Sequence, residues 1–278
     1  MGAFSGINCC ATWHGTSPSF FMSIRRLAEH ASRGVVLSRR LPSKFARLPI
    51  YVTPEAGLRY WMAMSRVDPL LYSMAEELVK PKSVIWDIGA NVGLFSFCAA
   101  ALAGPDGFVL AIEPDLWLAQ IIARSSRRLD SNSFQCSKVK VLCASVSDSA
   151  GISELEIAER ARASNHLVDA TGSTQAEASR HRQLTVSVTL DSLLEHFRAP
   201  SILKIDVETH EARVLRGAKR LLEEIRPSIW CEVSHQNSHE VGELLHEAKY
   251  DLYGAETHQR IERPWFQTLA IPATAASR

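Results

Sequence analysis

The stretch SVIWDIGANVGLFSF, residues 83–97, decides the fold. It opens with an apolar run, passes through Asp87 into a turn with glycines at positions 89 and 93, and ends in a long apolar helical pattern. This order predicts a buried strand, a tight loop and a buried helix. Gly89 lets the backbone turn sharply off the strand. Gly93 lets the helix start close to the sheet, so a ligand can lie over the loop and the helix N-terminus.

Asn91, the middle residue between the two glycines, indicates which ligand this loop takes. A dinucleotide fingerprint requires a third glycine where Asn91 stands, because a pyrophosphate presses against bare backbone there. Asn91 fills that space and offers an amide, while the Asp87 carboxylate at the strand end suits a ligand with an ammonium group. These features favour S-adenosylmethionine, which carries an amino-acid tail and a sulfonium but no phosphate. The cofactor-binding residues predicted here are Asp87, Gly89, Ala90, Asn91 and Gly93.

Three segments in order carry a family resemblance: WDIGANVG at 86–93, AIEP at 111–114 and LKIDVETHE at 203–211. They resemble the motifs of the FkbM-type family of S-adenosylmethionine-dependent methyltransferases, from about Leu41 to the C-terminal region. The resemblance implies a class I methyltransferase fold, an α/β, Rossmann-like, doubly wound sheet that is mostly parallel with an antiparallel C-terminal strand, preceded by helices. It also implies O-methylation of a hydroxyl on a sugar, glycolipid or secondary metabolite. Nothing in the residues chooses among these acceptors.

Length and composition set further bounds. A chain of 278 residues suits one large α/β domain with extensions, and a net charge of +1 gives no reason to expect nucleic acid as a partner. The six cysteines show no CxxC spacing and are typical of core residues in a reducing compartment. The first twenty residues lack a positive start followed by a continuous apolar stretch, so we expect no secretory signal. No apolar run reaches the ~18 residues that a transmembrane segment needs. We therefore expect a cytoplasmic protein without a transmembrane segment.

Two regions outside the central motifs have predicted roles. Residues 1–50 form an N-terminal extension, partly disordered, with a basic helix over Ile24–Arg47; residues 51–278 form the methyltransferase domain. The basic helix is a solvated surface or, alternatively, a contact for an acidic carrier or membrane headgroups. The polar stretch at about 158–183 is a flap over the acceptor, with Asn165 and His166 in contact with it, or a disordered loop without a role.

Acidic and polar residues at the next strand ends extend the cofactor site. Glu113 ends the predicted strand 108–112, ~20 residues past the glycine loop, where a carboxylate binds a ribose diol. The alternative is a cap for the helix that begins at Pro114. Ser145 and Asp148 lie at the end of the predicted strand 139–146, a usual place for contacts to adenine, although both residue types also make turns.

The fourth strand, 201–207, delivers the predicted catalytic groups. Strand alternation places Lys204, Asp206 and Glu208 on one side, and three ionisable groups beyond a strand end indicate a site. A mutual ion pair is the structural alternative. The family usually has glycine where this chain has Thr209; threonine caps a helix well, so the fold tolerates it, but the shape of the acceptor pocket is in doubt.

The expected reaction is an in-line displacement with the reacting atoms held ~3 to 3.5 Å apart. A general base contributes ~10²- to 10⁴-fold. His235, just past the strand 228–233, is the first candidate and Asp206 the second, with Lys204 keeping Asp206 or Glu208 ionised by pairing. A metal site of Glu232, His235 and His239 is possible by position, but no ligand spacing compels it, so no metal is predicted.

Two other functions stay open. A nicotinamide-dependent oxidoreductase uses the same fold, but Asn91 argues against it. A non-catalytic member that keeps the fold as a cofactor-binding or scaffold module is compatible with Thr209. Asp87, Gly89, Gly93 and Glu113 argue that the cofactor still binds.

Overall fold

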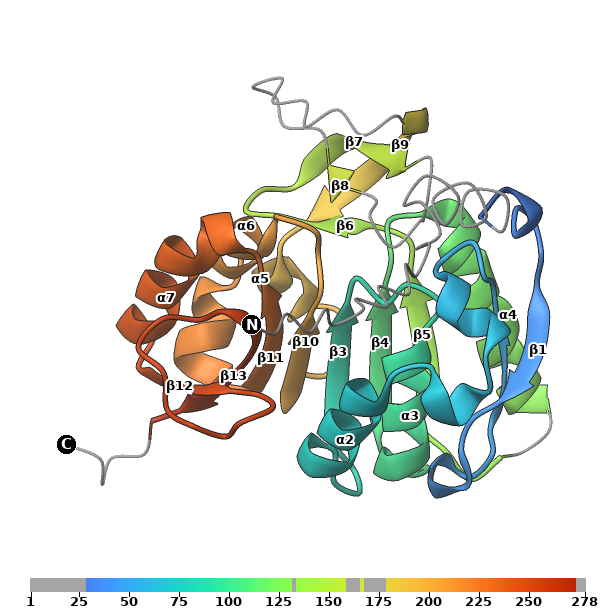
Figure 1. The fold of residues 1–278 in the computed structure, drawn as a ribbon. Helices are drawn as coiled ribbons and strands as arrows, with labels where there is room; N and C mark the ends of the chain where they lie inside the picture. Colours follow the sequence, from blue (N-terminus) through green and yellow to red (C-terminus); the bar gives the residue numbers. More distant parts are fainter. Residues whose placement is uncertain (1–28, 132–133, 159–165, 168–178, 274–278) are drawn as a thin grey trace, which may run out of the picture.

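A seven-stranded sheet forms the centre of the molecule. The computed structural model describes residues 29–131, 134–158, 166–167 and 179–273. The strands lie in the order β12-β13-β11-β10-β3-β4-β5 (Figure 1). Their bounds are β3 Val84–Ile88, β4 Phe108–Ile112, β5 Lys138–Leu142, β10 Ile202–Ile205, β11 Ser228–Val233, β12 Tyr250–Gly254 and β13 Phe266–Pro272.

Strand direction confirms the predicted fold class. Neighbouring strands from β11 through β5 are parallel, whereas β13 runs antiparallel to both β11 and β12. The C-terminal strand is thus antiparallel, as the family resemblance implies, and β12 runs in the direction of β11. The strands β11, β10, β3, β4 and β5 end at one edge, where the loops after β3, β4, β10 and β11 come together.

Helices cover both faces of this sheet because successive strand residues point to opposite sides. Ile85 and Val109 pack into one core with α2, α3 and α4, while Trp86 and Leu110 pack into a second core with α5, α6 and α7. The helices are α2 Pro69–Leu78, α3 Leu94–Ala103, α4 Leu116–Ser131, α5 Leu190–Leu193, α6 Glu211–Arg216 and α7 Ser238–Glu247, with a π-helical turn η5 at Leu221–Ile225 and a 3₁₀ turn η6 at His235–Asn237. The sheet is therefore doubly wound.

A second, smaller sheet lies beyond the carboxyl edge of the main sheet (Figure 1). Its order is β6-β9-β7-β8, with bounds β6 Ser145–Val146, β7 Gly151–Ala158, β8 His166–Leu167 and β9 Ser179–Val188. The predicted third strand is thus divided, since β5 ends at Leu142 and β6 joins the small sheet. Residues 179–183 of the predicted flap belong to β9, paired with β7. Asn165 lies outside the described residues, and His166 begins β8.

An antiparallel hairpin precedes the main sheet. It pairs β1 (Leu37–Arg40) with β2 (Pro49–Val52), and short 3₁₀ turns follow the strands: η1 Ser43–Phe45, η2 Leu58–Trp61 and η3 Met64–Arg66. Of the described part of the predicted basic helix, only residues 29–31 are helical, so the prediction is wrong from Ser32 onward. The chain turns there, and pairing with β2 then overrides the local preference of the segment. Phe45 and Ile50 are buried in the same core as α2 and α3. Within the described ranges, no helix combines the length and apolar character needed to cross a bilayer.

Candidate active site

The loop after β3 is fixed by close contact with two neighbouring strands. Gly89 has φ +76°, and a Cβ atom there would lie 1.9 Å from the Asp206 carbonyl oxygen, so only glycine fits. The N–H groups of Gly89 and Ala90 both donate to the Ile112 carbonyl at 3.0 Å. Asn91 has φ +56°, and its Oδ1 accepts a 2.8 Å hydrogen bond from the N–H of Val92. That N–H is thus already used at the place where a pyrophosphate would need it.

Glu113 stands at the end of β4 beside this loop. Its Oε2 accepts from the Asn91 N–H at 2.8 Å, and its Oε1 accepts from the Asp115 N–H at 2.9 Å. Burial raises the pKa of Glu113 to about 8, although both backbone donors favour the carboxylate. The cap of α4 is Asp115, whose Oδ1 accepts from the Trp117 N–H at 2.9 Å. The carboxylate of Glu113 is therefore oriented by the glycine loop.

A buried ion pair links β3 to β10, because the strand register places Lys204 opposite Asp87. Lys204 Nζ lies 3.4 Å from Asp87 Oδ1 and 3.1 Å from Asp206 Oδ2. Burial alone would lower the pKa of Lys204, but Asp206 and Asp87 raise it above its usual value. Ser96 Oγ donates to Asp87 Oδ2 at 2.6 Å, whereas Oδ1 accepts no hydrogen bond within the described chain. The pair fixes the β3 and β10 ends relative to each other.

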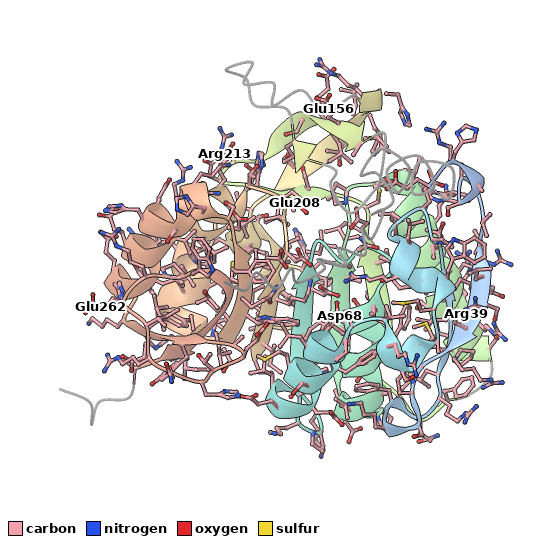
Figure 2. The ribbon with its side chains drawn as sticks, viewed as in Figure 1. Arg39, Asp68, Glu156, Glu208, Arg213 and Glu262 are labelled. Carbon is pink, nitrogen blue, oxygen red and sulfur yellow. The ribbon has the colours of Figure 1, made fainter. Side chains whose placement is uncertain are left out.

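A cavity of about 500 Å³ lies between the main-sheet edge, the small sheet and the η2 turn. Figure 2 shows Glu208 in this region, between the two sheets. The predicted site residues that line the cavity are Gly89, Ala90, Asn91, Glu113, Ser145, Lys204, Asp206 and Glu208. The structure thus brings together the glycine loop, the acid after β4 and the charged groups after β10.

Four predicted residues are not among those that line the cavity. Asp87 is fully buried behind Lys204. Gly93 begins α3 at φ +81°, and a Cβ there would lie 2.8 Å from the Phe97 ring, so its role is packing. Asp148 Oδ2 lies 3.8 Å from Arg216 Nη1, in an ion pair outside the cavity lining. His235 is exposed and contacts the Trp265 ring edge-on at 5.3 Å, so the structure does not bring it together with Asp206.

Ser145 lines the cavity, but its hydroxyl is also engaged in the small sheet. Its Oγ lies 2.6 Å from Ser187 Oγ and donates to the Val186 carbonyl at 3.3 Å. These contacts hold β6 against β9. Ser145 therefore positions the small sheet over the cavity.

Glu232 is a cavity residue that the sequence reasoning did not assign to catalysis. Its Oε2 accepts from Gln267 Nε2 at 2.6 Å, and Gln267 Oε1 accepts from Trp230 Nε1 at 2.6 Å. Burial and the charge of Asp206 raise the pKa of Glu232 to about 7. Its signal in the sequence was an acid one residue from the end of an otherwise apolar strand, SIWCEV.

A second carboxylate with a similar pKa stands nearby. Glu208 keeps an exposed side chain, but desolvation by the surrounding protein, with Asp206 and Glu232, raises its pKa to about 7. Glu208 lines the cavity. Two carboxylates that titrate near neutrality therefore face the same cavity.

The η2 turn forms part of the cavity wall, and no sequence motif predicted this. Arg59 and Tyr60 line the cavity, and Arg59 forms a 3.0 Å ion pair with Asp68, the N-cap of α2. Tyr60 is buried, and burial raises its pKa to about 12. These residues reach the site only because the β1–β2 hairpin folds back beside α3 and α4.

Thr209 has left-handed backbone, φ +63°, which explains why glycine suits this position. The predicted capping role is wrong: the N-cap of α6 is His210, and no side-chain cap bond forms there. Thr209 is displaced from the cap because the chain must turn before α6 begins. Glu211 instead accepts hydrogen bonds from the N–H and Oγ of Ser234 at 3.2 and 3.1 Å, which ties α6 to the end of β11.

Metal ligands do not gather in the part of the chain that the structure describes. No group of three His, Cys, Asp or Glu side chains there is arranged to hold a metal ion. The arrangement of Glu232, His235 and His239 considered above is therefore not formed. His239 Nδ1 instead lies 3.3 Å from Glu243.

The sheet order and the site define the class of this protein. The main sheet has a glycine loop after its first parallel strand, an acid after the second and a single antiparallel strand. This combination is typical of S-adenosylmethionine-dependent methyltransferases of class I. Residues 87–261 match the model of the methyltransferase FkbM domain. The chain belongs to this family.

Similar solved structures are distant. The FkbM methyltransferase from Methylobacillus flagellatus is 16% identical, with a TM-score of 0.46, over 72% of this chain and 50% of that one. Precorrin-6y C5,15-methyltransferase from Geobacter metallireducens is 12% identical, with a TM-score of 0.43, over 74% and 87%. An S-adenosylmethionine-dependent O-methyltransferase from Thermotoga maritima is 13% identical, with a TM-score of 0.41, over 75% and 66%. No curated protein sequence matches the chain significantly.

Proposed function

We propose that this chain transfers a methyl group from S-adenosylmethionine to a hydroxyl oxygen of a small-molecule or carbohydrate acceptor. One observation carries the proposal. A single cavity has the glycine loop and Glu113 on one wall and Asp206, Glu208 and Glu232 on the other. The first wall suits an adenosine, and the second offers carboxylates to a cationic ligand and to acceptor hydroxyls.

The residues present fit the cofactor that the family implies. Gly89 leaves bare backbone beside the cavity, Glu113 faces it with an oriented carboxyl group, and Asp206 offers an oxygen to an ammonium. A volume of about 500 Å³ lies within the usual range for small-molecule sites. In this assignment Gly89, Ala90, Asn91 and Glu113 hold the adenosine and Asp206 the amino group. The bound cofactor supplies an electrophilic methyl group on a sulfonium.

Glu232 is the general base in this proposal. A neutral hydroxyl is a poor nucleophile, so a carboxylate that takes its proton during attack accelerates the reaction by ~10²- to 10⁴-fold. Gln267 holds one oxygen of Glu232 and leaves Oε1 for the acceptor. A pKa of about 7 places the group between its two charge states at neutral pH. Of the bases expected from the sequence, Asp206 lines the cavity and is the alternative, whereas His235 is not among the lining residues.

Lys204 and Glu208 have positioning and binding roles. Lys204 contacts both Asp87 and Asp206, so it fixes the carboxylate that would receive the amino group. Glu208 faces the cavity and can accept hydrogen bonds from acceptor hydroxyls. Leu155 and Leu167 of the small sheet cover the cavity with apolar side chains that exclude water.

Isotope transfer tests this proposal. The protein is incubated with S-adenosylmethionine labelled at its methyl group and with sugars, glycolipids and polyketide alcohols, and products are analysed by mass spectrometry. We expect label on an acceptor oxygen and a loss of at least about a hundredfold in Glu232→Gln. Glu247→Gln, at an exposed position of α7, should retain full activity.

Other outcomes of this assay discriminate among the alternatives. Label on nitrogen or carbon would contradict O-methylation. Cofactor binding without transfer to any acceptor would instead favour a non-catalytic member of the family. Full activity of Glu232→Gln would assign the role of base to Asp206 or Glu208, the other carboxylates of this wall.

A further inference from the structure

One segment of the chain exposes charge of a single sign. Between residues 29 and 67 the acids are Glu29 and Glu55, and both are buried, at 8% and 5% exposure. Lys44 and Arg59 pair with Glu76 and Asp68. The other arginines of the segment form no ion pair with described residues; they are Arg33, Arg39, Arg40, Arg47 and Arg66. The charged surface of this segment is therefore cationic.

Helix α4 extends this surface from a distant part of the sequence. Arg124 and Arg127 are exposed, and the Arg124 guanidinium lies 3.9 Å from the centre of the Tyr51 ring on β2. Arg128 donates a 2.7 Å hydrogen bond to Ser38 Oγ on β1. Figures 1 and 2 show β1, with Arg39, and α4 on the same flank of the molecule. We use the name cationic flank for the five arginines of residues 29–67 without a described ion pair together with the two exposed arginines of α4: Arg33, Arg39, Arg40, Arg47, Arg66, Arg124 and Arg127.

Two large apolar side chains are exposed within the same segment. Trp61 is 48% exposed and Met62 46%. Trp61 Nε1 donates a 3.0 Å hydrogen bond to Ser32 Oγ, which holds the indole beside the turn that carries Arg33. Tyr60, which precedes Trp61 in the chain, lines the cavity. An exposed tryptophan among arginines, next to a substrate cavity, suits the boundary between water and lipid.

We propose that the cationic flank binds the surface of a bilayer that contains anionic phospholipids, with Trp61 and Met62 in the headgroup region. Arginine binds phosphate oxygens through its planar guanidinium, and each basic residue near an anionic leaflet adds to the attraction. Arg124 covers the Tyr51 ring, so that ring is not free to stack on a nucleic-acid base. This contact brings the η2 turn, whose Tyr60 lines the cavity, near the membrane, and it does not depend on the proposed reaction.

Vesicle flotation of the full chain tests the proposal directly. The probes are vesicles of phosphatidylcholine alone and of phosphatidylcholine with phosphatidylglycerol, at low and high salt. We expect binding to the anionic vesicles, weakened by salt, and none to the neutral ones. Arg33→Ala/Arg47→Ala/Arg66→Ala should lower the partition coefficient about 100-fold, from roughly fivefold per arginine.

Matched variants separate this contact from a loss of charge or of fold. Arg198→Ala/Lys219→Ala/Arg220→Ala removes three exposed cations elsewhere and should bind like the wild type. Trp61→Ser should weaken binding, whereas Trp265→Ser, at a tryptophan that is 61% exposed elsewhere, should not. Thermal unfolding checks that each variant is folded.

Several results would overturn the proposal. The wild type would fail to bind anionic vesicles, both triple variants would lose vesicle binding equally, or Trp61→Ser would bind vesicles as well as the wild type. Binding to duplex DNA that depends on the same arginines, without vesicle binding, would identify a nucleic acid as the partner instead.

Discussion

The two walls of the cavity are built in different ways. On the β3–β4 side, backbone geometry sets the shape: Gly89 is pressed against Asp206, and backbone N–H groups orient Glu113. On the β10–β11 side, ionisable side chains set the properties: loss of solvent contact and the repulsion of acidic neighbours raise the pKa of Glu208 and of Glu232 to about 7.

This difference separates the constraints on the two ligands. A wall made of backbone admits one shape, which suits a fixed cofactor. A wall made of ionisable side chains responds to pH and to substitution, which suits proton transfer and a variable acceptor. The predictions below test each wall, and the ion pair between them, in order of expected effect.

The largest effect is expected at the ion pair that joins the walls. Lys204→Met leaves Asp87, which is fully buried, without its cation and should lower the free energy of unfolding by about 3–5 kcal/mol. Adding Asp87→Asn should recover much of this loss. Lys82→Met, from an exposed pair with Asp106, is the control and should change stability by less than about 1 kcal/mol. Urea unfolding measures all of these; a small change in Lys204→Met would contradict the account.

The backbone wall is tested by adding one methyl group. Gly89→Ala should destabilise the protein by about 3 kcal/mol, because the new Cβ would meet the Asp206 carbonyl and φ is positive. Gly34→Ala is the matched control, since it has φ +71° but no atom within 4 Å. It should cost only about 1 kcal/mol. Equal losses in the two variants would show that the contact with Asp206 is unimportant.

The charged wall is tested by the pH dependence of transfer. A base acts when deprotonated, so with a pKa of about 7 for Glu232 the value of kcat/KM should rise with pH up to about 7 and then level off. Glu232→Gln should lower the rate at least about a hundredfold and remove this rise. Glu208→Gln should keep it. Loss of the rise in Glu208→Gln alone would make Glu208 the base.

The smallest effect is expected at Thr209. Thr209→Gly relieves a β-branched residue from left-handed backbone and should stabilise the protein by up to about 1 kcal/mol. Thr209→Ala removes the branched side chain but keeps a Cβ at positive φ, so it should gain less. Thermal unfolding of both variants measures the difference, and destabilisation by Thr209→Gly would indicate a contact for the threonine side chain.

The sequence predicts the backbone wall well, because local rules determine it. The glycines at 89 and 93 and the acid at 113 each follow from strand and turn chemistry within a short window. Strand alternation likewise predicts the positions of 204, 206 and 208 on the charged wall. The same rules gave the strands β4, β10 and β11 at or near their observed positions, but they joined β5 and β6 into one strand.

The remaining parts depend on contacts between distant segments. The β1–β2 hairpin forms by pairing rather than by local preference, and it brings Arg59 and Tyr60 to the cavity. Glu232 depends on Gln267 from β13, 35 residues away. His235 follows β11 as expected, but its ring packs against Trp265, because the chain turns into η6 immediately after the strand. A single sequence does not specify such pairings.

The most direct test of the central claim is calorimetric titration of the wild type, Glu113→Ala and the exposed control Glu247→Ala with S-adenosylmethionine, S-adenosylhomocysteine and NAD. The account predicts that the first two ligands bind and NAD does not, and that Glu113→Ala weakens binding at least about tenfold while the control does not. Binding of NAD alone, or S-adenosylmethionine binding that is unchanged in folded Glu113→Ala, would contradict it.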